Sequence, residues 1–194
     1  MLIRPQRGLS LVELMIAFTI GGMLLMAGIP AFTSWIQNAQ NRTAAESVVN
    51  GLQLARLEAV RRSAEVRFEL TDADGLVAWN VGCAVATAEC PSTIQRRKTA
   101  EGTVNARAGV STAILPNPLP PGYFDTAIAA GTGLPASVSF NGLGRPAVDD
   151  VTRIDITNAT SVSARRYVVT VSAGGQIRMC DPALKFSDNP QGCS

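Results

Sequence analysis

An unbroken apolar stretch near the N-terminus constrains this chain more than any other feature. No charged residue occurs between Glu13 and Arg42, and as an α-helix residues 14–36 would span roughly 34 Å, against about 30 Å for the hydrocarbon core of a bilayer. Arg4 and Arg7 precede the stretch, and positive charges there favour a cytoplasmic N-terminus. The pattern therefore predicts a single membrane span.

A secretory signal peptide and a plain membrane anchor are the simpler interpretations of this stretch. A signal peptide is not expected, because its apolar region is shorter and ends at an Ala-x-Ala-like site, whereas Ala27, Ala31 and Ala39 lack that spacing. A plain anchor explains the hydrophobicity. It does not explain Glu13, because an ionised carboxylate at the membrane edge costs free energy unless it has a partner.

The N-terminal residues resemble the signature of the type IV pilin and type II secretion pseudopilin superfamily. The resemblance comprises a short basic leader that ends at Gly8, Pro30 within the apolar stretch, and the sequence Leu9-Ser10-Leu11-Val12-Glu13-Leu14-Met15-Ile16. It implies that prepilin peptidase removes residues 1–8 by cutting between Gly8 and Leu9, and then methylates Leu9 as the new N-terminus. Phenylalanine is commoner at that position in the superfamily, so Leu9 departs from the pattern.

The same resemblance implies an assembly role for two residues of the helix. After cleavage, Glu13 becomes the fifth residue and Pro30 the twenty-second, which are the positions that the superfamily pattern expects. The Glu13 carboxylate would pair with the freed amine of a neighbouring subunit and set the axial register, and Pro30 would kink or locally melt the helix near Met26. The implied partners are other pilins or pseudopilins, prepilin peptidase and the inner membrane.

The helix is predicted to continue beyond the membrane. Apolar residues recur at helical spacing after Trp35, at Ala45, Val48, Val49, Leu52, Ala55, Ala59 and Val60. We therefore expect a helix over residues 9–62, with a membrane span at about residues 14–36 and an amphipathic part after it. Residues 63–194 are long enough for one β domain, which the resemblance places in the periplasm.

Beyond Ser63 the hydrophobic period changes from that of a helix to that of a strand. Strands are predicted over residues 66–70, 76–81, 93–97, 137–140, 153–157, 166–172 and 176–180. Residues 106–136 have weak periodicity and several prolines, which predicts a surface loop, and the basic run Arg96–Lys98 is interpreted as a solvated edge. The expected fold class is α+β: a long N-terminal helix followed by a small antiparallel β domain of two packed sheets.

Four cysteines allow three disulfide pairings, and the sequence alone does not choose among them. An exported domain favours disulfides over free thiols. Local pairing of Cys83 with Cys90 and of Cys180 with Cys193 is the simplest arrangement. A zinc site is not indicated, because the cysteine spacings are not those of zinc ligands and the chain has no histidine.

The sequence contains no recognisable catalytic or cofactor site. The lack of histidine excludes Ser-His-Asp and Cys-His sites, and no phosphate-binding glycine loop is present. Asp72 with Asp74, and Asp149 with Asp150, supply too few oxygens for calcium and are interpreted as turns. The formal net charge of +2 is balanced once the two leader arginines are removed. We therefore expect a structural subunit with no enzyme activity, no cofactor and no metal.

Further segments resemble the FimT/GspH subgroup of this superfamily, namely Leu52–Arg62 at the helix end and Phe140–Arg145 in a predicted turn. The C-terminal sequence Gly174–Pro182, together with Gly192 and Cys193, resembles the FimT side. That resemblance favours a minor type IV pilin that takes part in pilus assembly. The alternative is a GspH-like minor pseudopilin of the type II secretion system, because both have the same fold and the same N-terminal signature.

A DNA-uptake role would depend on the same C-terminal segment. FimT-like proteins that bind DNA carry Gly-Arg-x-Arg, and here Gln176 replaces the first arginine while Arg178 retains the second. Arg165 and Arg166 would extend these residues into a small phosphate-binding patch, because no acidic residue lies within residues 161–180. We favour the simpler interpretation, in which these side chains flank a β-hairpin and are solvated.

Overall fold

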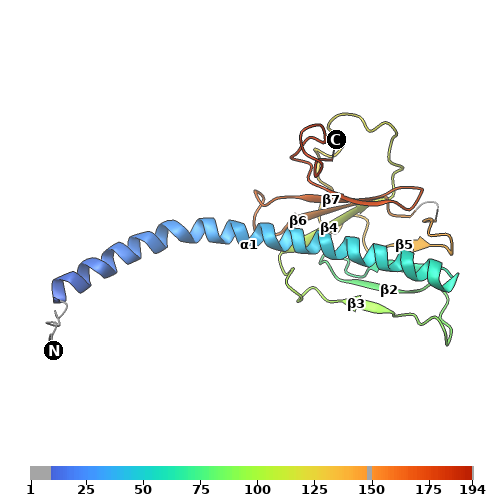
Figure 1. Ribbon diagram of the computed structural model, residues 1–194, viewed down its shortest axis with the longest axis horizontal. Helices are drawn as coiled ribbons and strands as arrows, with labels where there is room; N and C mark the ends of the chain where they lie inside the picture. The colour runs from blue at the N-terminus through green and yellow to red at the C-terminus, as the bar shows by residue number, and fades with distance from the viewer. Residues whose placement is uncertain (1–9, 148–149, 194) are drawn as a thin grey trace, which may run out of the picture. The chain divides into compact units, whose positions relative to one another are not determined.

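The computed structural model describes residues 10–147 and 150–193 (Figure 1). This part of the chain consists of one long helix, α1 (Leu11–Arg62), and a series of short strands. The strands are β1 (Val66–Leu70), β2 (Trp79–Cys83), β3 (Gln95–Arg97), β4 (Ala106–Ser111), β5 (Ala136–Phe140), β6 (Arg153–Asn158), β7 (Tyr167–Val171) and β8 (Ile177–Cys180). The chain divides into two compact units at Ile36, and α1 contributes to both.

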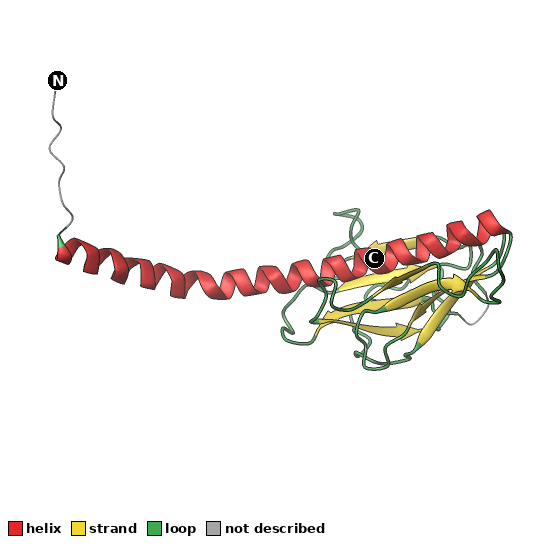
Figure 2. Cartoon of the chain, turned by 90° about the horizontal axis from the view of Figure 1, so that it is seen from below, coloured by secondary structure: helices red, strands yellow, loops and turns green. Residues whose placement is uncertain are grey.

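The strands form two antiparallel sheets of four strands each. Sheet A has the order β3-β2-β1-β5, and sheet B has the order β4-β6-β7-β8. Figure 2 shows these strands in yellow beside the C-terminal half of the red helix. The expected α+β fold, with two small antiparallel sheets after a long helix, is confirmed.

Alternation of apolar and charged residues explains β1, one of the two central strands of sheet A. Val66, Phe68 and Leu70 are buried, whereas Arg67 between them is exposed, as expected for a strand with one face on the core. After β1, the Asp72 carboxylate accepts hydrogen bonds from the backbone N–H groups of the second and fourth residues beyond it, at 3.0 Å each. These hydrogen bonds stabilise the predicted turn.

β4 corrects the expectation of a loop over residues 106–136. Ala106, Ala108 and Val110 are its core-facing residues, and the two alanines are too small to give a strong hydrophobic period in the sequence. The rest of the segment, residues 112–135, contains turns and loops as expected. The strand forms because it pairs with all six residues of β6, a contact that no local pattern reveals.

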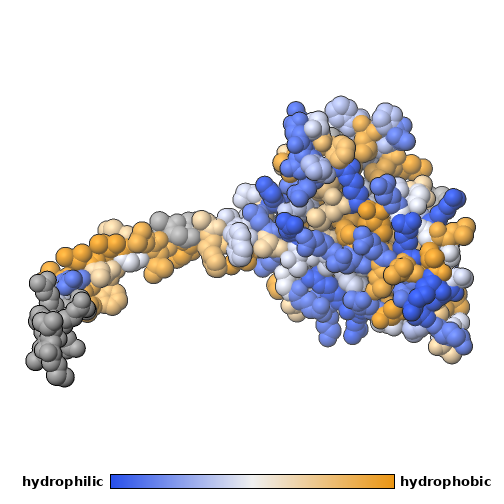
Figure 3. Space-filling view, viewed as in Figure 1, coloured by the Kyte–Doolittle hydropathy of each residue, from blue (hydrophilic) through white to orange (hydrophobic). Residues whose placement is uncertain are grey.

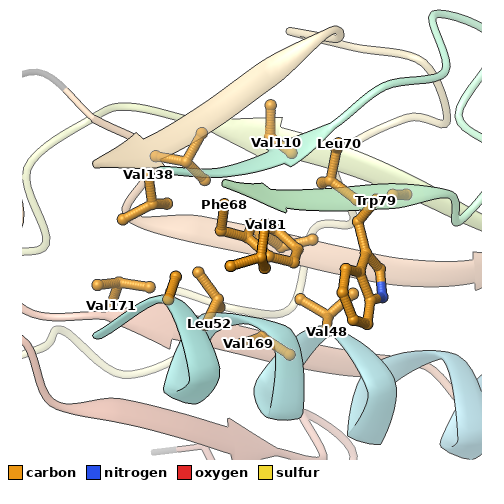
Figure 4. Packing of buried hydrophobic residues seen from close by; sticks show 14 of the residues in the cluster. Val48, Leu52, Phe68, Leu70, Trp79, Val81, Val110, Val138, Val169 and Val171 are labelled. Atoms are coloured by element: carbon orange, nitrogen blue, oxygen red, sulfur yellow. The ribbon is translucent and has the colours of Figure 1, made fainter. Parts of the chain in front are cut away.

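One hydrophobic core joins the C-terminal half of α1 to both sheets (Figure 4). Val48 and Leu52 are fully buried on the helix, and the figure shows them between Phe68 of sheet A and Val169 of sheet B. Trp79 also faces this core and is only 3% exposed. The predicted amphipathic face of the helix therefore packs on the β domain.

The first half of α1 has a different character. From Leu11 to Trp35 its large apolar side chains are exposed, and Figure 3 shows this stretch as a run of hydrophobic residues. The helix is long and apolar enough to cross a membrane. The helix continues without interruption through residues 26–30, so local melting of the helix is not observed there.

Arg97 corrects the interpretation of the basic run as a wholly solvated edge. Its side chain is nine-tenths buried against α1, where it donates hydrogen bonds to the Ser47 hydroxyl and, at 2.7 Å, to the backbone oxygen of Glu101. Burial lowers the pKa of Arg97, and the charge of Glu101 offsets part of this effect. Arg96, which points the other way on the same strand, is exposed as expected.

Gly51 lets α1 approach sheet A closely, which gives a testable prediction. A methyl group at this position would lie 2.6 Å from Cε2 of Phe68 and 3.3 Å from Trp79. Both rings are buried, so we expect Gly51→Ala to lower the free energy of unfolding by roughly 1–3 kcal/mol despite the better helix propensity of alanine. Denaturation of the full chain in detergent, followed by near-ultraviolet circular dichroism, measures this change.

Gln53→Ala is the matched control, because Gln53 is exposed on the same helix. This variant should be as stable as the parent or slightly more stable. Equal stability of the Gly51→Ala variant and the parent would contradict the close packing described for Phe68.

Candidate functional site

The N-terminal signature lies at the start of α1. Ser10 caps the helix, because its hydroxyl accepts a hydrogen bond from the Glu13 N–H at 3.2 Å. Glu13 is exposed among exposed apolar side chains and, within residues 10–147 and 150–193, forms no ion pair. Gly8 and Leu9 lie outside the described residues. Pro30 lies within α1.

Both disulfides in the β domain are local. Cys83 at the end of β2 is bonded to Cys90, with their Cα atoms 5.7 Å apart, and this bond closes the loop that leads towards β3. Cys180 at the end of β8 is bonded to Cys193, with a Cα–Cα distance of 4.9 Å. The second bond holds the C-terminal segment against sheet B.

The four candidate DNA-binding residues are spread along the β7–β8 hairpin. Arg165 and Arg166 immediately precede β7, Gln176 precedes β8, and Arg178 lies opposite Thr170 in the middle of the hairpin. Because strand residues advance about 3.4 Å each, the two arginines before β7 lie several residues from Arg178 along the sheet. The structure therefore does not gather these side chains into one cluster.

Each of the three arginines already has a partner within the protein. Arg165 Nε lies 3.7 Å from the buried carboxylate of Asp181, and Arg166 Nη1 lies 2.5 Å from the fully buried carboxylate of Asp155. Arg178 donates to the backbone oxygen of Gly192 at 2.5 Å, and its guanidinium lies 4.5 Å from the centroid of the Phe186 ring. Asp181 directly follows residues 161–180, which contain no acidic residue, and Asp155 precedes them in the sequence.

Asp155 is the centre of a group that the sequence analysis did not identify. Arg153 Nε donates to Asp155 Oδ1 at 2.7 Å and its Nη2 donates to Oδ2 at 2.9 Å, while Arg166 donates to Oδ2 from the other side. The backbone N–H of Ile128 also donates to Oδ2, at 3.0 Å. We call Arg153, Asp155 and Arg166 the buried triad. Alternation along a strand places Arg153 and Asp155 on the same face of β6, but no local pattern shows that a loop buries this face.

The buried triad fixes the loop between β4 and β5 on the outer face of sheet B. Arg153 donates to the backbone oxygens of Tyr123 and Thr126, at 3.2 and 2.7 Å, and Arg166 donates to the backbone oxygens of Phe124 and Asp125. The Arg153 guanidinium also lies 5.0 Å from the centroid of the Phe124 ring. Backbone carbonyls and a carboxylate thus satisfy two cations that the loop shields from water.

A second charged cluster forms where α1 ends. Glu58 accepts hydrogen bonds from Arg61 Nη2 and Arg62 Nε, each at 2.7 Å, and Arg62 also donates to the backbone oxygen of Glu89 in the Cys83–Cys90 loop. Burial acts to raise the pKa of Glu58, but the hydrogen bonds and charges of the two arginines outweigh burial and lower it. An open groove of about 600 Å³ lies beside this cluster.

Within the part of the chain that the structure describes, these charged groups position a loop and the end of α1, and they form no catalytic arrangement. The groove beside Glu58 is lined by both acidic and basic side chains, with no nucleophile and base in contact. Within residues 10–147 and 150–193, no three His, Cys, Asp or Glu side chains form a group that would hold a metal ion.

Two family models match parts of the sequence. The family model described as "Type II transport protein GspH" matches residues 44–175, and the model described as "Prokaryotic N-terminal methylation motif" matches residues 3–29. No curated protein matches the sequence.

Two crystal structures of the type IV minor pilin FimU from Pseudomonas aeruginosa are similar to this chain. One is 18% identical and covers 79% of this chain and 99% of its own, with a TM-score of 0.44. The other is 17% identical and covers 82% and 99%, with a TM-score of 0.47. The minor pseudopilin EpsH of the Vibrio cholerae Type 2 Secretion System is 13% identical and covers 75% and 99%, with a TM-score of 0.48.

A long helix that is apolar and exposed in its first half, and packed on two small antiparallel sheets in its second half, defines a subunit of the type IV pilin and pseudopilin superfamily. Within it, the chain belongs to the GspH family, whose model matches more than half of the residues. This is a family of structural minor pilins and pseudopilins rather than enzymes.

The buried triad gives a second testable prediction. Asp155→Asn would leave two buried guanidinium groups without their carboxylate, and breaking a buried ion pair in this way typically costs about 3–5 kcal/mol. We expect a lower free energy of unfolding and faster hydrogen exchange at residues 123–128. Asp74→Asn in an exposed turn is the control and should change neither quantity. Unchanged exchange at residues 123–128 would show that the triad does not hold the loop.

The lowered pKa of Glu58 predicts how stability depends on pH. A carboxyl group whose pKa is lower in the folded than in the unfolded protein stabilises the fold above its unfolded value of 4.5, and this contribution is lost as the pH falls through the folded value. We therefore expect acid unfolding of the full chain to show a smaller loss of stability below pH 4.5 in a Glu58→Gln variant than in the parent. Parallel curves for the two proteins would contradict the prediction.

Proposed function

We propose that this chain is a minor structural subunit of a type IV pilus-like filament. In this proposal, prepilin peptidase cuts between Gly8 and Leu9 and methylates Leu9. The helix then anchors the subunit in the inner membrane at about residues 14–36, with a cytoplasmic N-terminus and a periplasmic β domain over residues 63–194. The observation that supports it most is the single carboxylate of Glu13 on an otherwise apolar, exposed helix surface.

In this proposal, Glu13 pairs with a cation of another subunit. Leu11, Val12 and Met15 are more than half exposed and would be covered by lipid or by the same helices of adjacent subunits. A carboxylate in such surroundings is costly unless a cation pairs with it. The α-amine freed at Leu9 of an adjacent subunit is a cation at the correct depth, because it is only four residues from its own Glu13. Pairing would then set the axial register between subunits.

Two machines use subunits of this kind, and different observations favour each. The resemblance of Gly174–Pro182 to FimT favours a minor type IV pilin that takes part in pilus assembly. The description of the matched family model favours a GspH-like minor pseudopilin of the type II secretion system. Co-purification of the full chain with major pilin or with major pseudopilin from the same host distinguishes the two. We retain the pilus as the first candidate and the pseudopilus as the alternative.

The Glu13 proposal predicts a separation of membrane insertion from assembly. Glu13→Ala should leave the chain in the membrane fraction, since the apolar span is unchanged, and should strongly reduce its recovery in sheared filaments, because the ion pair that sets the register is absent. Glu13→Asp, which retains the charge, should recover part of the incorporation. Normal incorporation of the Glu13→Ala subunit would overturn the proposed role.

If the protein takes part in DNA uptake, the Arg178→Ala variant should bind DNA more weakly than the parent. We expect no such loss of binding. Arg165 and Arg166 are already paired with carboxylates, so Arg178 alone has neutral partners and a single phosphate contact gives little affinity. We expect the full chain in detergent and its Arg178→Ala variant to bind short double-stranded DNA equally weakly at two salt concentrations. Lys185→Ala, which removes an exposed charge nearby in the sequence, is the control. Binding that is lost only in Arg178→Ala, and that weakens with salt, would instead support DNA uptake.

A further inference from the structure

β8 forms one outer edge of sheet B, and the phase of its hydrogen bonds is defined by the hairpin. Ser172 follows β7 and Gln176 precedes β8, and the Ser172 N–H donates to the Gln176 oxygen at 3.0 Å at the turn end of the hairpin. In an antiparallel pair, alternate residues exchange both hydrogen bonds with the partner strand. Arg178 and Cys180 therefore direct their backbone groups towards β7. The N–H and C=O groups of the intervening residues, Ile177 and Met179, face outwards.

The next outward-facing residue along this edge, Asp181, already has a backbone partner. Asp181 continues the outward phase, and its N–H donates to the backbone oxygen of Gln191 at 2.7 Å. Asp181 and Gly192 form a parallel bridge, so an extended piece of the chain's own C-terminal segment pairs with this end of the edge. This end of the edge therefore already pairs with a second backbone segment.

The outer edges of β5 and β4 are covered by other segments of the chain. Beside β5, Ala147 and Val151 donate to the backbone oxygens of Ser139 and Ser137, at 2.9 and 3.4 Å. Beside β4, the Val110 N–H donates to the Thr132 oxygen at 2.9 Å. Sheet edges left open are places where another chain can add a strand, and proteins usually cover them.

The outward backbone groups of β8 have no such cover. Within residues 10–147 and 150–193, the outward N–H and C=O groups of Ile177 and Met179 have no backbone partner. Their side chains point to the opposite side of the sheet from Arg178, are half-buried and pack against the main core, so the strand is held firmly although its edge is open. An edge with this structure favours strand addition over a flexible contact.

We infer that the open edge of β8 pairs with an extended segment of a different pilin-like subunit, which adds a fifth strand to sheet B and places a carboxylate opposite Arg178. This inference rests on the proposed function, because it takes the occupant from the other subunits of the same filament. The backbone hydrogen bonds to Ile177 and Met179 would supply the affinity, and the charge of Arg178 would select the partner.

The position of Arg178 argues against a second copy of this chain as the occupant. Two copies that used both outward residues would pair antiparallel about a two-fold axis at Arg178, with the two Arg178 residues directly opposite each other. Like charges in directly opposed positions are destabilising. A different segment with an acidic residue there is favoured, and it would not have to break an ion pair, because the present partners of Arg178 are the Gly192 oxygen and the Phe186 ring.

Hydrogen exchange on the full chain in detergent tests the inference residue by residue. Purified, processed pilin-like subunits of the same host are added one at a time, and exchange is measured at the amides of residues 177–180. In the complex, exchange at Ile177 and Met179 should slow by about tenfold or more. Exchange at Arg178 and Cys180, which already bond to β7, should not change and so provides the internal control.

A pair of variants separates loss of the edge from loss of the fold. Ile177→Pro removes an outward N–H that bonds to nothing within the described residues, and proline is tolerated on edge strands at such positions. It should weaken the complex at least several-fold, whereas Ile177→Val should not. Unchanged exchange at Arg178 and Cys180 in the free Ile177→Pro chain verifies that the hairpin is intact.

Three results would overturn the inference in distinguishable ways. A complex in which Ile177 and Met179 exchange as fast as in the free chain would reject strand addition and leave the proposed function standing. Protection that rises with the concentration of this chain alone would identify a second copy as the occupant. No complex with any pilin-like subunit would reject the proposed function together with this inference.

Discussion

The contact of the C-terminal half of α1 with both sheets is the interaction on which the β domain depends. Each sheet has one apolar face, and the two faces meet through the helix side chains Val48 and Leu52 rather than through one another alone. Full burial of an aliphatic or aromatic side chain contributes about 1.5–3 kcal/mol, so this shared core is the main source of stability. Gly51 and the fully buried alanines keep the helix close enough for both sheets to reach it.

The opposite face of sheet B shows how a polar group can specify structure instead of supplying stability. A buried ion pair gains little net free energy, because both charges lose their hydration, but it is costly to break. The buried triad therefore determines where the loop around Phe124 lies more than how stable the domain is. It also engages Arg166, which leaves the hairpin with less free positive charge than its sequence indicates.

The two halves of α1 meet opposite requirements within one continuous helix. Small residues such as Ala45 and Ala55 are fully buried in the second half, where the sheets supply the large side chains. In the first half, large residues such as Leu25 and Phe32 are exposed and need lipid or neighbouring helices around them. A chain that belongs to the GspH family and carries a single carboxylate at the start of such a helix fits a membrane-anchored filament subunit.

Several features of this protein were determined by local sequence pattern alone. The apolar stretch after Glu13 predicted the long helix, and the alternation around Phe68 predicted β1. The resemblance of Gly8, Glu13 and Pro30 to a known signature indicated the superfamily. These patterns are readable because period and charge act over a few neighbouring residues.

Only the tertiary structure decided the roles of residues whose partners are distant in the chain. β4 exists because it pairs with β6, Arg97 is buried because α1 covers it, and Asp155 neutralises Arg166 because a loop from elsewhere closes over them. The open edge of β8 likewise follows from sheet order, which no local pattern encodes. Long-range strand pairing and burial depend on contacts between distant parts of the chain. A short segment does not contain these contacts, so its sequence pattern cannot predict them.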